Sequence, residues 1–96
     1  AEAVADFRRA AELLPDEPAV AYDLGLALSD AGEYAEATGH LRRAAGDAEF
    51  RARASMVLGL AELRLGNLAA ADEAFVQAGS DPSLVARASF YRGVTA

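Results

Sequence analysis

The chain repeats itself at a spacing of 34 residues. The clearest match is Ala-Arg-Ala-Ser at 52–55, which recurs letter for letter at 86–89, and Leu24-Gly25 recurs as Leu58-Gly59. A fixed period between about 20 and 50 residues is typical of a stacked repeat array. Because one such unit cannot bury its apolar face alone, neighbouring units stack and create an extended surface, which predicts a scaffold for other molecules. The other matching positions are Gly32 and Gly66, Ala37 and Ala71, Leu41 and Phe75, and Ala44 and Ala78; one step back, Ala37, Leu41 and Ala44 correspond to Ala3, Phe7 and Ala10.

Composition narrows the classes of function. Fifteen acidic residues against nine basic ones give a net charge of −6. An acidic domain has the wrong long-range field for a phosphate backbone, so nucleic acid is excluded as a partner. No apolar run approaches the ~18 residues of a bilayer span, so we expect a soluble chain without direct membrane insertion. The absence of cysteine fits the cytoplasm, which we favour slightly, as well as the periplasm.

Proline and glycine predict where helices begin and end. Prolines separate the first two helices, and Gly32 and Gly66 supply the left-handed residues that close the second and the fourth. Ser80 or Asp81 is expected to cap the sixth helix, with Pro82 at its first position. The short connections predict antiparallel neighbours. The expected helices are Glu2–Leu14, Pro18–Ala31, Tyr34–Ala45, Glu49–Leu65, Leu68–Ala78 and a last one that starts at Pro82.

In this register the chain resembles the tetratricopeptide repeat, a 34-residue helix–turn–helix unit. In that family the first helix of each unit, helix A, carries Leu-Gly, and the second, helix B, carries a small residue, then an aromatic residue or leucine, then alanine. The resemblance covers the whole chain and implies an all-α domain, a right-handed α-solenoid of antiparallel helix hairpins with about six helices. Its parts are a half repeat at 1–17, full repeats at 18–51 and 52–85, and a half repeat at 86–96, as expected of a fragment of a longer protein.

Small residues at repeated positions have a mechanical reason. Gly25 and Gly59 are expected to let helix B approach helix A closely, with Ala37 and Ala71 as the facing small residues. A larger side chain there would separate the two helices at a cost of ~1–3 kcal/mol. The large residues expected to fill the layers between hairpins are Phe7, Leu41 and Phe75.

Four positions depart from the family pattern. Ala21 and Ser55 replace a large residue, so the core is expected to be slim there. Glu62 and Arg92 lie at positions where other units carry leucine. Such charges either distort the C-terminal part of the array or compensate one another as an ion pair. We predict the pair, because two isolated buried charges would be far costlier.

In proteins of this family, fixed positions of helix A line an inner groove. Because Leu-Gly and its equivalents take the buried face, these positions are expected to leave a second apolar stripe exposed, and such stripes mark partner sites. The alternative is that neighbouring hairpins cover them. Arg53 and Arg87 flank the stripe; their recurrence reflects either duplication alone or a fork for a partner's carboxylate. The carboxylate clamp of chaperone-binding members is absent, since only Arg87 matches it. The three columns of groove positions are Tyr22, Met56 and Phe90; Asp23, Val57 and Tyr91; and Leu26, Leu60 and Val94.

The sequence contains no motif typical of catalysis and no residues for a nitrogen–sulfur metal site, and its carboxylates are interpreted as solubilising groups on loops and outer faces. The single histidine, His40, has no second histidine or cysteine with which to form a nitrogen–sulfur metal site, and we expect it on the surface. No phosphate-binding glycine loop, nucleophile elbow or Ser/His/Asp set is present. The paired arginines at 8–9 and 42–43 are interpreted as a solvated outer face with i,i+4 pairing, for example to Glu12. The sequence therefore predicts neither an enzyme nor a bound cofactor.

The predicted function is a protein–protein interaction module that binds a peptide or helix of a partner protein in an apolar concave groove. The alternative is a structural module whose open repeat ends stack on other repeats or on another copy. The first and last helices lack the helix that completes their unit, and they carry apolar side chains that this helix would cover. We therefore also expect self-association through the terminal helices. These apolar side chains are Phe7, Leu14, Phe90, Tyr91 and Val94.

Overall fold

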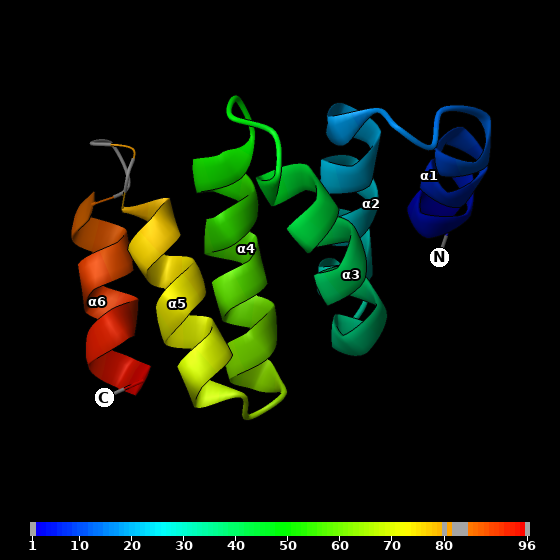
Figure 1. The fold of residues 1–96 in the computed structure, drawn as a ribbon. Helices are drawn as coiled ribbons and strands as arrows, with labels where there is room; N and C mark the ends of the chain where they lie inside the picture. Colours follow the sequence, from blue (N-terminus) through cyan, green and yellow to red (C-terminus); the bar gives the residue numbers. More distant parts are fainter. Residues whose placement is uncertain (1, 80, 82–84, 96) are drawn as a thin grey trace.

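All regular secondary structure is helical in the part of the chain that the computed structural model describes, which is residues 2–79, 81 and 85–95. Six helices follow one another there, joined by short connections (Figure 1). The predicted all-α class is therefore confirmed. The helices are α1 (Glu2–Leu13), α2 (Pro18–Asp30), α3 (Tyr34–Ala45), α4 (Arg51–Arg64), α5 (Leu68–Ala78) and α6 (Val85–Thr95).

The helix boundaries agree with the sequence to within two residues for the first five helices. The largest difference is at α4, which begins at Arg51 rather than at Glu49. The side chain of Asp47 accepts a hydrogen bond from the Glu49 N–H at 3.0 Å, and its carbonyl accepts one from the Phe50 N–H at 3.1 Å. These bonds close a turn ahead of the helix and delay its start. Of the predicted cap of α6, Ser80 and Pro82 lie outside the described residues.

Two glycines close α2 and α4 as predicted. Gly32 has φ +84° and Gly66 has φ +81°, a left-handed conformation that glycine adopts at little cost. The residues that follow them donate N–H bonds back to Leu28 and Glu62, at 2.8 and 2.9 Å. This six-to-one bond is the mark of a Schellman ending, which satisfies carbonyls that the helix leaves free.

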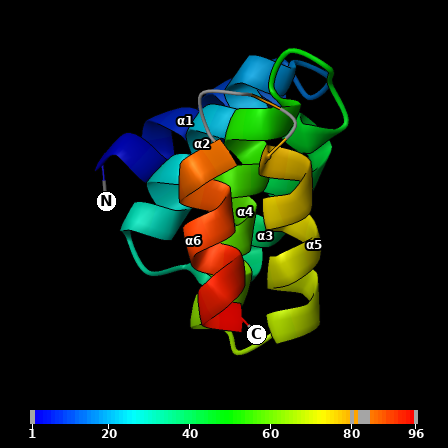
Figure 2. The same ribbon diagram turned by 90° about the vertical axis from the view of Figure 1, so that its left-hand side faces the viewer.

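Each helix packs against its neighbours in the sequence, and α2 also touches α4. Figure 1 shows α4, α5 and α6 side by side, with the chain reversing direction at each connection. Figure 2, a view along the row, shows α6 in front of α4 and α5 to one side. The molecule measures 38 × 25 × 17 Å, so the helices form an elongated row rather than a sphere.

In each of the two central hairpins, α2–α3 and α4–α5, a glycine of the first helix leaves room for a large side chain of the second helix. We call this close contact a glycine socket. A Cβ atom at Gly25 would lie 2.6 Å from Cγ of Leu41, and one at Gly59 would lie 2.5 Å from Cε1 of Phe75. The close approach was predicted, but with alanines opposite the glycines. The atoms nearest to each glycine belong instead to the large helix B residue, so the glycine makes room for a side chain and not only for a backbone. Leu41 and Phe75 are fully buried as a result.

Glu62 and Arg92 were predicted to form an ion pair with each other. In the structure they do not, and each has a different partner. The carboxylate of Glu62 is buried and accepts bonds from Nη2 of Arg42 at 2.6 Å and Nδ2 of Asn67 at 3.1 Å. Arg92 is exposed, and its Nε donates to Asp72 at 3.1 Å. The reason is geometric: the preceding hairpin brings an arginine to Glu62, while the last helix leaves Arg92 at the surface.

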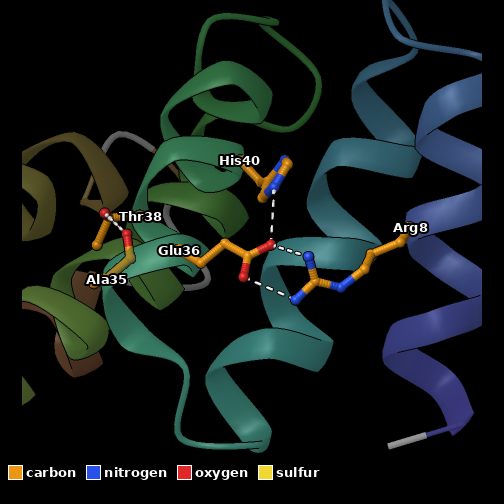
Figure 3. Close-up of polar contacts among 5 residues, drawn as sticks. All are labelled: Arg8, Ala35, Glu36, Thr38 and His40. Carbon is orange, nitrogen blue, oxygen red and sulfur yellow. Dashed lines mark hydrogen bonds and ion pairs between the residues drawn. The ribbon is translucent and has the colours of Figure 1, made fainter.

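Two of the outer arginines, Arg8 and Arg43, bind segments other than their own helix. Arg8 of α1 makes a two-pronged ion pair with Glu36 of α3, and the bond from Nη2 to Oε1 measures 2.8 Å (Figure 3). Arg43 donates to the carbonyl of Pro15 at 3.3 Å. The predicted pairing to Glu12 within one helix is therefore replaced by bonds between successive hairpins. These bonds link α1 and its following turn to α3.

Candidate protein-binding surface

The first predicted column does not form an exposed stripe. Met56 is only 5% exposed, because it packs into a cluster with Phe75 of α5 and Ala88 of α6. The expectation that this methionine faces a partner is wrong. Tyr22 is half-buried, and only Phe90, which is 68% exposed, faces solvent fully.

Half-buried side chains form most of the other two columns. Val57 packs against the cluster that contains Leu24 and Leu41. Leu60 and Tyr91 pack against the cluster around Phe75, and the Tyr91 ring lies stacked on the Phe75 ring with centroids 5.2 Å apart. Each of these side chains covers the core with one side and keeps the other in solvent.

The ends of these columns differ from their middle. Asp23 is exposed, whereas Leu26 is half-buried and lines a hollow of about 350 Å³ between α1 and α2. Val94 lies in α6, but its side chain lies outside the described residues. Arg87, at the start of the same helix, is exposed. The predicted groove residues that stay accessible on α2, α4 and α6, which we call the A-helix face, are Tyr22, Asp23, Leu26, Arg53, Val57, Leu60, Arg87, Phe90 and Tyr91.

Arg53 is held on two aromatic rings. Its guanidinium carbon lies 4.8 Å from the centre of the Phe50 ring and 5.7 Å from that of Tyr22, and the two rings are 5.8 Å apart. Cation–π attraction of this kind contributes about 0.5–1 kcal/mol at an exposed site. Among the described residues the structure gives the N–H groups of Arg53 no hydrogen-bond acceptor. The result is an oriented, exposed cation between α2 and α4.

Phe50, one of the two rings that hold Arg53, was not indicated by the sequence. It precedes α4 in the turn, and the residues 34 positions away are Asp16 and Leu84, so the repeat gives it no aromatic counterpart. A single aromatic residue in a turn ahead of a helix was the only available signal. Phe50 packs against the small cluster of Ala21, Ala44, Ala45 and Ala54, which explains why an aromatic ring stands there.

A second hollow, of about 540 Å³, lies between α3, α4 and α5. The charged side chains that line it are Arg42, Arg51, Glu62 and Glu73, and the first three of these bond within the chain. Arg42 binds Glu62, and Nε of Arg51 donates to the Ala45 carbonyl at 3.2 Å. These charges hold hairpins together, and nothing about them indicates a ligand.

His40 lies on α3 beside Glu36, with 4.0 Å between Nε2 and the carboxylate (Figure 3). Partial burial lowers the pKa of His40, and Arg43 and Arg8 lower it further, while the Glu36 carboxylate opposes them. The side chain is 26% exposed, so the predicted surface position is only partly correct.

Within residues 2–79, 81 and 85–95, no group of three or more His, Asp or Glu side chains is arranged to hold a metal ion. None of the helices described here has both the length and the apolar character needed to cross a bilayer.

Comparison with known proteins adds no family assignment: none of the models of known protein families matches the chain, and no curated protein sequence matches it.

Proposed function

We propose that the chain is a tetratricopeptide-type repeat module in which the hairpins stack as a right-handed array. The support is the 34-residue period together with the two glycine sockets, which recur at the same positions of successive units. Stacked arrays of this kind present one helix of each unit along a continuous surface. Here that surface is the A-helix face, on α2, α4 and α6.

The proposed function is to bind a peptide or helix of another protein on the A-helix face. Leu26, Val57 and Leu60 are half-buried, so a partner that covers them removes further apolar area from water, at about 25 cal/mol per Å². Tyrosine, phenylalanine and arginine are enriched at the centres of protein interfaces. All three residue types lie on this face, as Tyr22, Phe90 and Arg53.

The observation that carries the proposal is the stacked guanidinium of Arg53. The guanidinium carbon lies against the two rings, and no acceptor among the described residues takes its N–H groups, which stay available to a partner. Because the rings already fix its orientation, little side-chain freedom remains to be lost when it binds a carboxylate. Val57 and Leu60 follow one and two turns further along the same face of α4. We therefore expect a partner segment with a carboxylate opposite Arg53 and apolar residues opposite Val57 and Leu60.

The test is to select peptides from a random displayed library on the immobilised protein and to map the selected peptides by NMR. We expect them to combine an acidic residue with apolar ones and to perturb the amide signals of α2, α4 and α6. Perturbations confined to the outer surfaces of α3 and α5 would contradict the proposed face.

Two arginines of α4 provide a matched pair of variants. Arg53→Ala is expected to weaken a selected peptide by about tenfold or more, since a charge-assisted hydrogen bond contributes about 1.5–3 kcal/mol. Arg64→Ala removes another exposed arginine, in the last turn of the same helix, and is expected to leave the affinity unchanged. Equal losses for both variants would show that net charge, and not the stacked arginine, attracts the peptide.

A further inference from the structure

One carboxylate links α1 to the α2–α3 hairpin, a contact that we call the first joint. Both oxygens of Glu36 on α3 accept bonds from the guanidinium of Arg8 on α1, and the bond from Nη2 to Oε1 measures 2.8 Å (Figure 3). Arg43 of α3 adds a bond of 3.3 Å to the carbonyl of Pro15, in the turn after α1. The Arg8 and Glu36 side chains are partly exposed, so the ion pair that fixes α1 against α3 lies at the surface.

A histidine lies beside the same carboxylate. His40 is one turn further along α3, and its Nε2 lies 4.0 Å from Oε2 of Glu36, which is beyond hydrogen-bond distance. When it is protonated, His40 becomes a second cation next to Glu36, at the i,i+4 spacing at which opposite charges attract one another on a helix. Two cations then compete for one carboxylate, and only one of them, Arg8, belongs to α1.

The closed first joint opposes protonation of His40. Partial burial lowers the pKa of His40, and the charges of Arg43 and Arg8 lower it further, against the opposing charge of Glu36. No charged group that the structure describes on α2 or α4, which also pack against α3, is among these causes. If α1 moves away from α3, the charge of Arg8 is removed and Glu36 is released to pair with His40. The open arrangement therefore binds the proton more tightly, and protonation shifts the equilibrium toward it.

The next joint of the row, between the α2–α3 and α4–α5 hairpins, has the arginine without the histidine. Arg42 occupies the repeat position of Arg8, but it bonds the buried carboxylate of Glu62 on α4. The two positions that carry the glutamate and the histidine in the first joint are alanines in α5, Ala70 and Ala74. Because the chain has a single histidine, this second joint contains no side chain that ordinarily titrates near neutral pH.

We propose that the first joint is a pH-sensitive switch, in which protonated His40 competes with Arg8 for Glu36 and α1 moves away from α3 while it stays packed on α2. The second joint does not respond. An exposed ion pair of this kind corresponds to about half a pH unit in the pKa of the histidine, and hence to about a threefold change in the ratio of open to closed molecules. The switch lies on α1 and α3 and does not depend on peptide binding at the A-helix face.

The test is a distance measurement by NMR between about pH 7.5 and about pH 5, above the ordinary pKa of carboxyl groups, about 4. The chain has no cysteine, so Glu12→Cys, at an exposed position of α1, carries a single spin label. We expect the label to broaden the amide signals of α3 less as the pH falls, with the midpoint that the ring signals of His40 give. Val76→Cys, at a half-exposed position of α5, carries the control label, whose broadening of α3 should not change.

Three variants, made in the labelled Glu12→Cys protein, separate the switch from a general effect of acid. His40→Gln cannot be protonated and should keep the broadening constant over the whole range. Arg8→Gln removes the competing cation and should raise the midpoint of His40 by about half a pH unit. Arg9→Gln is the matched control, since it removes a neighbouring exposed arginine of α1, and it should leave the midpoint unchanged.

A distance between α1 and α3 that stays constant while His40 titrates would overturn the proposal. So would a pH-dependent distance that persists in His40→Gln, which would assign the change to carboxyl groups. Equal shifts of the His40 midpoint in the Arg8 and Arg9 variants would exclude competition for Glu36. Circular dichroism at both ends of the pH range checks that α1 moves as a helix; a loss of helicity at low pH would contradict the proposed movement.

Discussion

The α2–α3 and α4–α5 hairpins use the same repeat positions with different side chains. In the first, Leu41 fills the socket at Gly25, and Leu28 is fully buried. In the second, Phe75 fills the socket at Gly59, and the position of Leu28 belongs to Glu62. The carboxylate of Glu62 is as buried as the leucine, with only 3% of its side chain exposed.

This difference shows that the position in the repeat determines whether a side chain is buried. The neighbouring residues determine whether that buried side chain can be charged or must be apolar. A buried carboxylate is costly unless its oxygens are bonded, and here Arg42 and Asn67 bond them. Asn67 follows α4, but Arg42 comes from α3. The second hairpin therefore depends on the first for its charge balance, whereas Leu28 needs only apolar neighbours.

The largest expected effect comes from emptying the sockets. Phe75→Ala is expected to destabilise the protein by ~3–5 kcal/mol and Leu41→Ala by ~2–5 kcal/mol, because the remaining backbone cannot refill the volume. Urea unfolding followed by circular dichroism measures both. Val76→Ala, at a half-exposed neighbour, is the control and should change stability by less than about 0.5 kcal/mol. A loss at Val76 as large as that at Phe75 would show that the buried face of α5 is assigned incorrectly.

The next largest loss of stability is expected when the ion pair between Arg42 and Glu62 is broken. Arg42→Ala is expected to cost ~1–3 kcal/mol, since it leaves a buried carboxylate with one fewer donor. The cost stays below that of a fully buried pair because 59% of the Arg42 side chain is exposed, so water can reach the site.

Glu62→Leu sharpens the same comparison by giving the second hairpin the leucine of the first. Replacing a buried ion pair by apolar residues is often neutral or stabilising by about 1–4 kcal/mol. We expect the same range for Glu62→Leu, because the Arg42 side chain that loses its partner is 59% exposed and can be solvated. In that background Arg42→Ala should cost almost nothing, and a full loss there would mean that Arg42 acts through packing instead of charge. Stability differences from the same urea titrations decide between the two.

Replacing the glycines of the two hairpins by alanine is expected to change the stability by smaller amounts. Gly59→Ala places a methyl group against the edge of a rigid ring, and Gly25→Ala places one against a leucine branch that has more freedom to turn. Both should destabilise by ~1–3 kcal/mol through overpacking, with the larger loss at Gly59. Gly93→Ala, in an open socket, should instead stabilise the protein by up to about 1 kcal/mol through helix propensity. Thermal melts of the three variants at low protein concentration provide the comparison.

The smallest expected effect concerns His40, whose counterpart in α5 is Ala74. Partial burial lowers the pKa of His40 in the folded protein, so the unfolded chain binds the proton more tightly. Stability is therefore full above the unfolded pKa of about 6.5 and falls as the pH drops from there toward the lower folded pKa. His40→Ala should change stability at neutral pH by less than about 0.5 kcal/mol and should remove this part of the pH dependence. Urea titrations of both proteins at several pH values measure it; identical pH profiles would contradict the assignment.

The sequence by itself determined the number of helices and most of their boundaries. Periodic apolar positions, prolines and glycines act within a few residues of one another, so local spacing is enough to predict helices such as Tyr34–Ala45. Gly32 and Gly66 were identifiable for the same reason, because a left-handed ending is a property of a single residue. The two glycine sockets followed from the period, although the side chains that fill them did not.

The tertiary structure alone decided which face of each helix remains accessible. Met56 belongs to the same repeat column as Phe90, yet it is buried because α5 and α6 cover it, while no described segment covers Phe90. Likewise the partner of Glu62 is Arg42 and not Arg92, because successive hairpins bring α3 and α4 together. Position in the repeat sets the direction of a side chain. Only the packing of one helix against another sets what that side chain meets, since those contacts join residues about twenty or more positions apart in the chain.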